Sequence, residues 1–359
     1  MRPPARAKRW RRRRKEPGSF FVVGLGALVV LVCAAALAVG AVPIGVGDIV
    51  AVLARAAGIT TAATPDAAAE AVLLHVRLPR VLLAAGVGAV LAACGCAMQG
   101  LFRNPLADPS LIGVSAGAAV AVVAATVLGT HAGIERTLGA AFAPAAGFAG
   151  ALASVTLVHR LSLREGRTVV TTMLLCGIAV NALAGATTSL LIHFADDAQL
   201  RTVTFWTMGS LSGASWTSVA IATPIFLASV AALLPMANGL NAMMLGEAEA
   251  LHLGIDVEHA KRRLLCATSL GVAAAVSVSG IIGFVALVAP HLMRLMCGPD
   301  HRRTLGGAAA LGAILLVSAD IGARTLASPA ELPVGALTAL AGAPLLLWLL
   351  RSAGVERAR

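Results

Sequence analysis

The sequence of 359 residues contains no tyrosine, only four tryptophans and only 13% charged residues. Apolar residues make up 58% of the chain, and the mean hydropathy is +0.87. A water-soluble domain of this size could not hide that much apolar surface from solvent. The composition therefore excludes an ordinary soluble enzyme or binding domain and predicts that lipid surrounds much of the chain.

Motifs of common catalytic sites are also missing. There is no Walker A sequence (GxxxxGK[ST]), so the chain is not expected to bind ATP phosphates through that loop. The zinc pattern HExxH is absent, and none of the six cysteines forms a CxxC pair. We interpret the cysteines as small apolar core residues and lone histidines such as His193 and His291 as structural groups. We therefore predict that the chain is not an enzyme and that it binds no metal or cofactor of its own.

Positive charge is concentrated at the N-terminus, where residues 2–15 hold nine of the 28 Lys and Arg residues. Such a tail could bind nucleic acid or begin a secretory signal. The apolar run over 19–42 is longer than the core of a signal, which spans about 7–15 residues, and this favours a retained helix. We predict a basic cytoplasmic tail over residues 1–18 that faces anionic lipid, and no nucleic-acid partner.

Ten apolar runs approach the roughly 20 residues that a helix needs to span a bilayer. They cover residues 20–42, 81–101, 110–129, 138–159, 169–192, 215–235, 262–279, 281–297, 305–323 and 333–350. Ten crossings place both termini on one side, and the segments on that side hold 22 of the 28 basic residues. Because positively charged loops stay inside, both termini are predicted to be cytoplasmic. The prediction is an all-α, polytopic membrane protein with one transmembrane domain over 19–352 and a cytoplasmic C-terminus over 353–359.

Two polar connections interrupt this pattern on the predicted inner side. Residues Arg103–Pro109 contain two Asx-Pro steps, which disfavour helix and predict a rigid turn, with Asp108 or Ser110 able to cap the next helix. The connection over 243–261 predicts a short helix at 245–253 that ends at Gly254. That helix is either a solvated surface element or one that docks into a groove on another protein.

Three arginines, Arg77, Arg80 and Arg324, stand near the predicted outer ends of helices. They could be anchors that reach the interface, or they could pair with carboxylates on a soluble partner. Asp320 and Glu331 flank Arg324 and could instead neutralise it locally. The sequence leaves these alternatives open.

Short motifs follow one another in a fixed order along the chain. They are Arg77-Leu78-Pro79-Arg80, Gln99-Gly100-Leu101, Arg103–Pro109, Gly246-Glu247-Ala248 with Leu253-Gly254, Gly283–His291 with Arg294, Gly298–Arg302, Asp320 with Arg324, Glu331–Gly335 and Gly342-Ala343-Pro344. In this order, over about residues 20–352, they resemble the FecCD family of ATP-binding-cassette (ABC) importer permeases, which take up ferric siderophores, haem and vitamin B12. One departure is Ala286, where the family usually has glycine.

The resemblance implies a BtuC-like (type II) ABC importer permease fold that pairs with a second permease copy, as a homodimer or with a close paralogue, around a central path. Two ABC ATPase subunits, which bind ATP and Mg, and an extracytoplasmic solute-binding protein would complete the complex in a bacterial inner membrane.

The resemblance also implies three groups of site residues. They are an ATPase-coupling group (Gly246, Glu247, Ala248, Leu253, Gly254), a binding-protein docking group (Arg77, Arg80, Arg324) and a cytoplasmic gate (Asn104, Leu106, Thr171, Thr172). Polarity alone predicts a fourth group that lines the path, namely Asn181, Thr187, Thr188 and Ser189.

The resemblance favours a ferric siderophore as cargo, with haem or cobalamin as alternatives. A rival from another class is an ion-driven secondary transporter, which would need carboxylates within the membrane. Asp320 is the best candidate for such a group, but it stands near a helix end.

Overall fold

The computed structural model of this chain describes residues 19–40, 43–56, 58–59, 66–132 and 139–357. The predicted basic tail over 1–18 lies outside the described residues. Within them the fold is helical, apart from one antiparallel hairpin of β1 (Leu163–Arg164) and β2 (Arg167–Thr168). The predicted all-α membrane fold is therefore confirmed.

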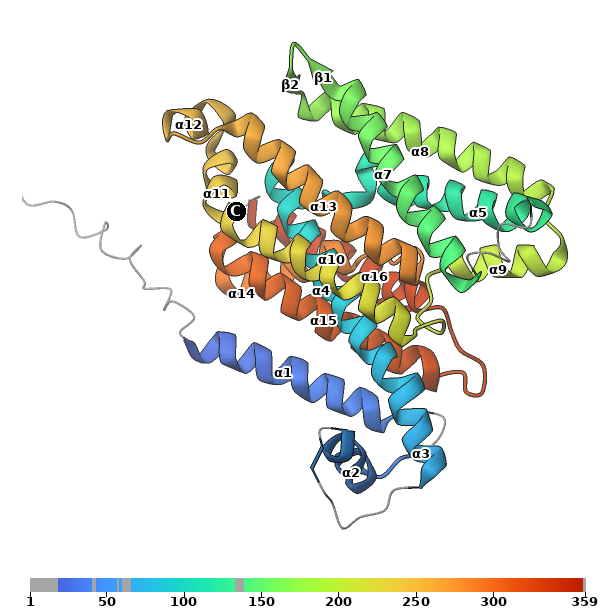
Figure 1. Cartoon of the computed structure of the whole chain (residues 1–359). Helices are drawn as coiled ribbons and strands as arrows, with labels where there is room; N and C mark the ends of the chain where they lie inside the picture. The colour runs from blue at the N-terminus through green and yellow to red at the C-terminus, as the bar shows by residue number, and fades with distance from the viewer. Residues whose placement is uncertain (1–18, 41–42, 57, 60–65, 133–138, 358–359) are drawn as a thin grey trace, which may run out of the picture.

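Each of the ten predicted spans coincides with a helix (Figure 1). The helices are α1 (Ser19–Ala38), α4 (Leu78–Leu101), α5 (Val114–Ala132), α7 (Phe142–Ser162), α8 (Val170–His193), α10 (Trp216–Leu233), α13 (Val257–Ser279), α14 (Val285–Cys297), α15 (His301–Thr325) and α16 (Val334–Arg357). Within the described residues, six helical stretches are long and apolar enough by themselves to cross a bilayer. The apolar stretches of α5, α14 and α16 are shorter, and α13 begins with a charged turn.

Shorter helices occupy the connections. The connection over 43–79 contains α2 (Val46–Ala56), α3 (Ala67–Val72) and the π-helical turn η2 (Leu73–Arg77), which runs directly into α4. Other short elements are η3 (Pro109–Ile112), α9 (Asp197–Thr207), α11 (Ala237–Leu245) and α12 (Glu247–His252). Helix α9 was not predicted from the sequence, although Asp196 and Gln199 form a capping box at its start.

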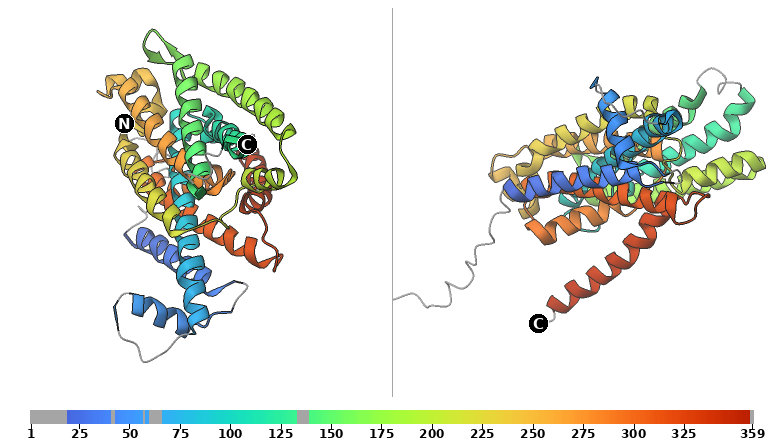
Figure 2. Two further views of the ribbon diagram at one scale, coloured as in Figure 1. Left: turned by 45° about the vertical axis from the view of Figure 1, so that its right-hand side comes forward. Right: turned by 90° about the horizontal axis from the view of Figure 1, so that it is seen from below.

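Helix α4 is the most deeply buried element, with α15, α10, α14 and α13 packed around it (Figures 1 and 2). Gly88 of α4 and Gly312 of α15 lie with their backbones in contact, and a methyl group added to either would collide with the carbonyl of the other. Lipid gives no hydrophobic drive between helices, so association depends on such close packing. The α4–α15 contact is therefore the centre of the bundle.

The cysteine predictions hold only in part. Cys94 and Cys96 on α4 are fully buried, as expected for small apolar core residues. Cys266 is exposed on α13, so the same prediction is wrong for that residue. An exposed position on a helix tolerates cysteine because the residue need not pack.

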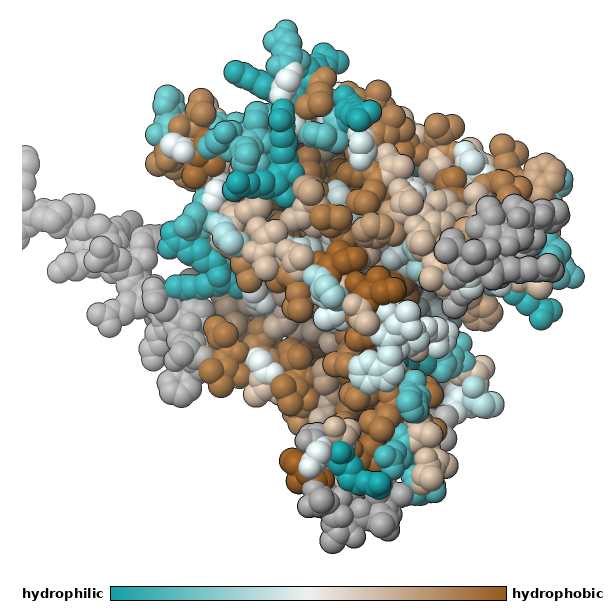
Figure 3. All heavy atoms as spheres, in the orientation of Figure 1, coloured by the Kyte–Doolittle hydropathy of each residue, from teal (hydrophilic) through white to brown (hydrophobic). Residues whose placement is uncertain are grey.

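The bundle has two distinct ends. Helices α11 and α12, the hairpin and the start of α1 lie toward one end, which we call the α12 end, whereas α2, α3 and α9 lie toward the other, the α2 end (Figure 1). Hydrophilic side chains gather at the α12 end around the hairpin, and hydrophobic side chains dominate the helices between the two ends (Figure 3). This distribution is the one expected of a bundle that spans a bilayer.

The close contact at Gly88 can be tested with Gly88→Ala. We expect a loss of stability of about 1–3 kcal/mol, because a methyl group there forces the two backbones apart. Thermal unfolding in detergent measures the change. Gly26→Ala on α1 is the matched control, since nothing lies within 4 Å of a methyl group added there. Equal melting temperatures for the two variants would contradict the packing account.

Candidate functional site

Helix α12 is a single short turn that stands out at its end of the bundle. It begins after Gly246, whose φ is 144°, and the chain reverses after it at Gly254, whose φ is 81°. The predicted short helix and its stop at Gly254 are thus confirmed. Ala250 is fully buried and anchors the helix, whereas Leu251 and Leu253 are 65% and 64% exposed. The helix presents apolar side chains outward from a fixed base.

The segment that leads into α12 is tied to the start of α15. The side-chain amide of Asn241 on α11 donates to Asp300 Oδ1 over 2.7 Å, and the Asn241 Oδ1 atom accepts from the backbone N–H of His301 over 2.9 Å. The backbone N–H of Arg302 also donates to Asp300. The hydrogen bond from Arg302 and, to a smaller extent, the one from the Asn241 amide hold the pKa of the Asp300 carboxyl below its usual value. α11 therefore has a fixed position relative to the bundle.

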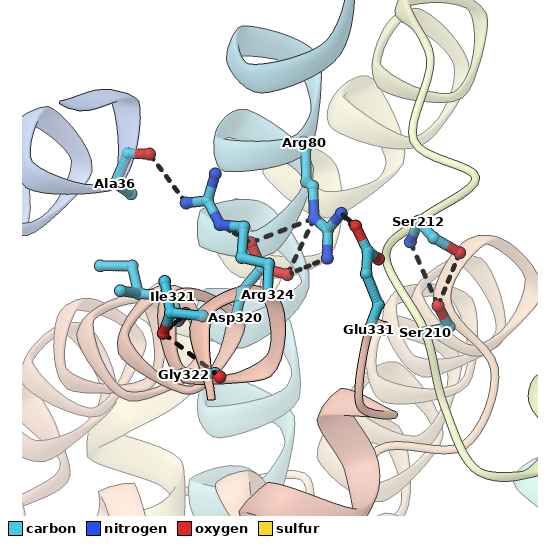
Figure 4. Close-up of polar contacts among 10 residues, drawn as sticks. Ala36, Arg80, Ser210, Ser212, Asp320, Ile321, Gly322, Arg324 and Glu331 are labelled. Carbon is cyan, nitrogen blue, oxygen red and sulfur yellow. Dashed lines mark hydrogen bonds and ion pairs between the residues drawn. The ribbon is translucent and has the colours of Figure 1, made fainter. Parts of the chain in front are cut away.

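The three arginines predicted to dock a partner are buried near the α2 end, and two of them, Arg80 and Arg324, meet at Asp320 (Figure 4). Arg77, Arg80 and Arg324 are only 4%, 6% and 7% exposed. Arg80 lies between two carboxylates, with its Nε atom 2.9 Å from Asp320 Oδ1 and its Nη1 atom 2.9 Å from Glu331 Oε1. None of the three guanidinium groups is exposed to a partner in this arrangement, and their docking role stays a prediction.

These arginines instead join segments within the chain. Arg324 donates to the carbonyl of Ala36 over 2.7 Å and forms an ion pair with Asp320 at 3.4 Å. Arg77 donates to the carbonyl of Leu37 over 2.6 Å. The guanidinium groups therefore satisfy carbonyls at the end of α1 that would otherwise lack partners. Local neutralisation, the third alternative from the sequence, is the arrangement that the structure shows.

The predicted gate turn is ordered by its own side chains. Asn104 Oδ1 accepts from the backbone N–H of Leu106 over 2.9 Å, and Asp108 Oδ1 accepts from that of Ser110 over 2.8 Å. The predicted cap at Asp108 is therefore confirmed, although it starts the 3-10 turn η3, and α5 begins only at Val114. Asn104 and Leu106 are exposed. Their role as a gate stays a prediction.

The remaining predicted gate and path residues all lie on α8. Thr171 and Thr172 are in its first turn, where Thr171 is exposed and Thr172 is half-buried. Asn181 donates through its amide to the carbonyl of Ser110 over 3.2 Å, so this side chain fastens α8 to η3 and does not face a path freely. Most of the α8 residues after Asn181 are exposed or half-buried.

The hydroxyl groups of α8 are bonded within the helix. Thr187 donates to the carbonyl of Leu183 over 2.9 Å, and Ser189 donates to that of Gly185 over 3.0 Å. Thr188 is half-buried. The role of these residues in lining a path stays a prediction.

Comparisons with known proteins bear directly on this architecture. The sequence model of the FecCD transport family matches residues 27–352. The chain belongs to the FecCD transport family. The hemin transport system permease HmuU of Yersinia pestis is 48% identical over 77% of this chain and 82% of its own length. The cobalamin import system permease BtuC of Halobacterium salinarum is 45% identical over 80% of this chain and 75% of its own length.

A solved structure supports the same assignment. A metal-chelate type ABC transporter in an inward-facing conformation superposes with a TM-score of 0.80 and 30% identity, covering 93% of this chain and 99% of that chain. This FecCD-family chain is therefore a multi-pass permease of the ABC importer class. Its relatives are transport subunits and not enzymes.

One short segment of the sequence matches a catalytic motif, but the fold around it is not the fold that the motif requires. Residues 113–117 read Gly-Val-Ser-Ala-Gly, which fits the GxSxG pattern of serine hydrolases. That motif requires a strand before the serine, whereas this family member has the 3-10 turn η3 there and the start of α5. Ser115 is thus an ordinary helix residue.

Lys261 was not predicted from the sequence to be a site residue; it is buried at the α12 end with its Nζ atom 2.7 Å from Glu247 Oε2. One signal was available: Lys261 is the only lysine after residue 15. Ala286, the departure from the FecCD pattern, packs its backbone against Gly95 and accepts a hydrogen bond from Gln99 over 3.3 Å. Its methyl group does not prevent this close contact.

The buried cluster around Asp320 predicts a large cost for Asp320→Asn. Arg80 and Arg324 would lose the carboxylate between them, and breaking a buried ion pair costs about 3–5 kcal/mol. Thermal unfolding in detergent measures the loss. Glu70→Gln removes the same charge from the exposed Arg55–Glu70 pair and is the matched control, with an expected change of about 0–1 kcal/mol. A similar melting temperature for both variants would rule out this role of Asp320.

Proposed function

We propose that this permease is the membrane subunit of an importer for a metal chelate, which passes between two permease copies and is driven by two separate ATPase subunits. The observation that carries the proposal is α12, a fixed short helix with Leu251 and Leu253 exposed. Apolar side chains displayed in this way suit a groove on another protein. The chain has no Walker A loop, so ATP and Mg would bind on the partner subunits.

The charge distribution supports one orientation of the complex. The α12 end is cytoplasmic, because the segments on that side hold 22 of the 28 basic residues. Both termini then lie in the cytoplasm of a bacterium, and the ATPase subunits contact α12 from the cytoplasmic side. A solute-binding protein docks at the α2 end. Contact with Arg77, Arg80 and Arg324 at that end requires these buried side chains to become exposed.

We expect helix α8 to line the path. It is exposed along most of its length and carries Thr187, Thr188 and Ser189 near its far end. Large apolar side chains such as Leu175 and Leu183 are 63% and 67% exposed on it. A second copy of the chain that packs along α8 would cover apolar positions and leave the hydroxyl groups beside a central passage.

The cargo is a metal held by an organic chelator. The sequence resemblance favoured a ferric siderophore, but the relatives described above are named for hemin and cobalamin, in which a macrocycle holds the metal. This favours a macrocyclic chelate over a siderophore. The structural neighbour is described only as a metal-chelate type transporter, which fits both classes.

An ion-driven transporter is disfavoured by the position of Asp320. Both oxygens of this carboxylate are engaged, by Arg80 and by Arg324. A coupling carboxylate must exchange protons or ions during transport. Asp320 is held too firmly between two cations for that role.

Uptake into vesicles tests the energy source and the cargo together. With the ATPase and binding protein present, we expect uptake of haemin or cyanocobalamin only when ATP and Mg are supplied on the α12 side. A ferric siderophore serves as the competing cargo. Uptake by the permease alone under an ion gradient would refute the proposal.

The docking role of α12 is tested by replacing Leu251 and Leu253 together with Ser. Losing two buried apolar contacts should lower ATPase binding by about tenfold or more, since burial of one such side chain contributes about 1.5–3 kcal/mol. Co-purification with the ATPase measures the effect. Leu326→Ser is the control, because it changes a 70% exposed leucine that directly follows α15, away from the α12 end. Undiminished recovery of the ATPase would exclude α12 as its docking site.

A further inference from the structure

Lys261 lies in the first turns of α13 and is only 2% exposed. Its ammonium group donates to three oxygens: Glu247 Oε2 at 2.7 Å, Thr168 O at 3.0 Å and Glu258 Oε1 at 3.2 Å. An ammonium group has three N–H donors, so its hydrogen-bonding capacity is filled. Each acceptor belongs to a different element, namely α12, the hairpin and α13.

The hairpin is also fastened to α13 by other contacts. The backbone N–H of Thr168 donates to Glu258 Oε2 over 2.9 Å, and Arg262 donates to the carbonyl of Gly166 over 3.2 Å. Thr168 is 2% exposed. Glu258 thus accepts from Lys261 through one oxygen and from the hairpin through the other.

The hairpin leads directly into α8. β2 ends at Thr168, and α8 begins two residues later at Val170. Thr171 and Thr172, the predicted gate residues on α8, follow at once. Only Lys261 and this short link of chain therefore separate Glu247 on α12 from the first turn of α8.

We propose that Lys261 is a positioning residue that transmits the movement of α12 to α8. A buried ammonium ion cannot give up an acceptor cheaply, because no water replaces it. Displacement of α12 by an ATPase subunit therefore carries Glu247, Lys261 and Thr168 together and shifts the start of α8. This inference rests on the proposed function for its driving force, but the linkage itself is a property of this chain alone.

The linkage can be tested in the purified permease without any partner. Glu247→Gln weakens one contact of Lys261 and leaves Glu258 and Thr168 in place, so the variant is expected to fold. We expect hydrogen exchange of the amides over residues 163–170 to rise about tenfold, the change that corresponds to one weakened charge-assisted hydrogen bond. The substitution affects the hairpin through Lys261, which contacts both Glu247 and the Thr168 carbonyl.

Glu165→Gln is the control, because it removes the same charge from the exposed tip of the hairpin, away from Lys261. Unchanged exchange at Thr168 in Glu247→Gln would overturn the linkage. The same would follow if Glu165→Gln raised exchange at Thr168 as much as Glu247→Gln does.

The transmission is tested in the reconstituted importer. For Glu258→Gln, which changes a partner of Lys261 outside the predicted ATPase-coupling group, we expect the ATPase to remain bound and to hydrolyse ATP, while the amount of haemin or cyanocobalamin taken up per ATP falls about tenfold relative to Glu165→Gln. An unchanged ratio would show that Lys261 only braces the structure and would overturn the transmission. If the wild-type importer failed to use ATP for uptake, the proposed function would be wrong, and the exchange comparison would still decide the linkage.

Discussion

The close approach of α4 to α15 is the constraint on which the rest of the structure depends. Lipid rewards apolar surface whether or not helices touch, so helices that associate in a membrane must do so through close packing and polar contacts. Gly88 and Gly312 allow backbone contact at the centre of the bundle. Because α4 is fixed there, α10, α13 and α14 can pack around it and bring the polar ends of the chain into register.

Buried charge occurs near each end of the bundle and connects segments distant in sequence. Near the α2 end, Asp320 joins Arg80 on α4 to Arg324 on α15, and Arg324 reaches the end of α1. At the α12 end, Lys261 joins three elements through three acceptors. A buried ion that loses one partner is left uncompensated, which costs far more than the pair contributes. Such clusters therefore tie together the segments that contact them.

The two clusters differ in what they fasten. The Asp320 cluster holds the long helices α1, α4 and α15 and Glu331, which lies just before α16. The Lys261 cluster holds two short elements, α12 and the hairpin, that have little buried surface of their own. Short elements of this kind are positioned mainly by their polar contacts, so a single buried ion has a large share in where they lie. Under the proposed coupling, a force applied to α12 would therefore reach α8 through few groups.

Several features were predictable because they depend on neighbouring residues. The ten helices, the cap at Asp108 and the stop at Gly254 follow from local apolar length, side-chain chemistry and backbone preference. The burial of Arg77, Arg80 and Arg324 was not predictable in the same way. Their partners lie up to 288 residues away, at Ala36 in the case of Arg324, and sequence spacing does not show such pairings.

The sequence by itself determined that this chain spans a membrane and where its ten apolar segments lie, because hydropathy acts on each segment separately. Its family followed from the order of its motifs. Only the tertiary structure decided that three arginines face inward, that Asn181 fastens α8 to η3 and that a solitary lysine joins α12 to the hairpin. Those outcomes depend on which helices meet, and that is set by packing between segments far apart in the chain.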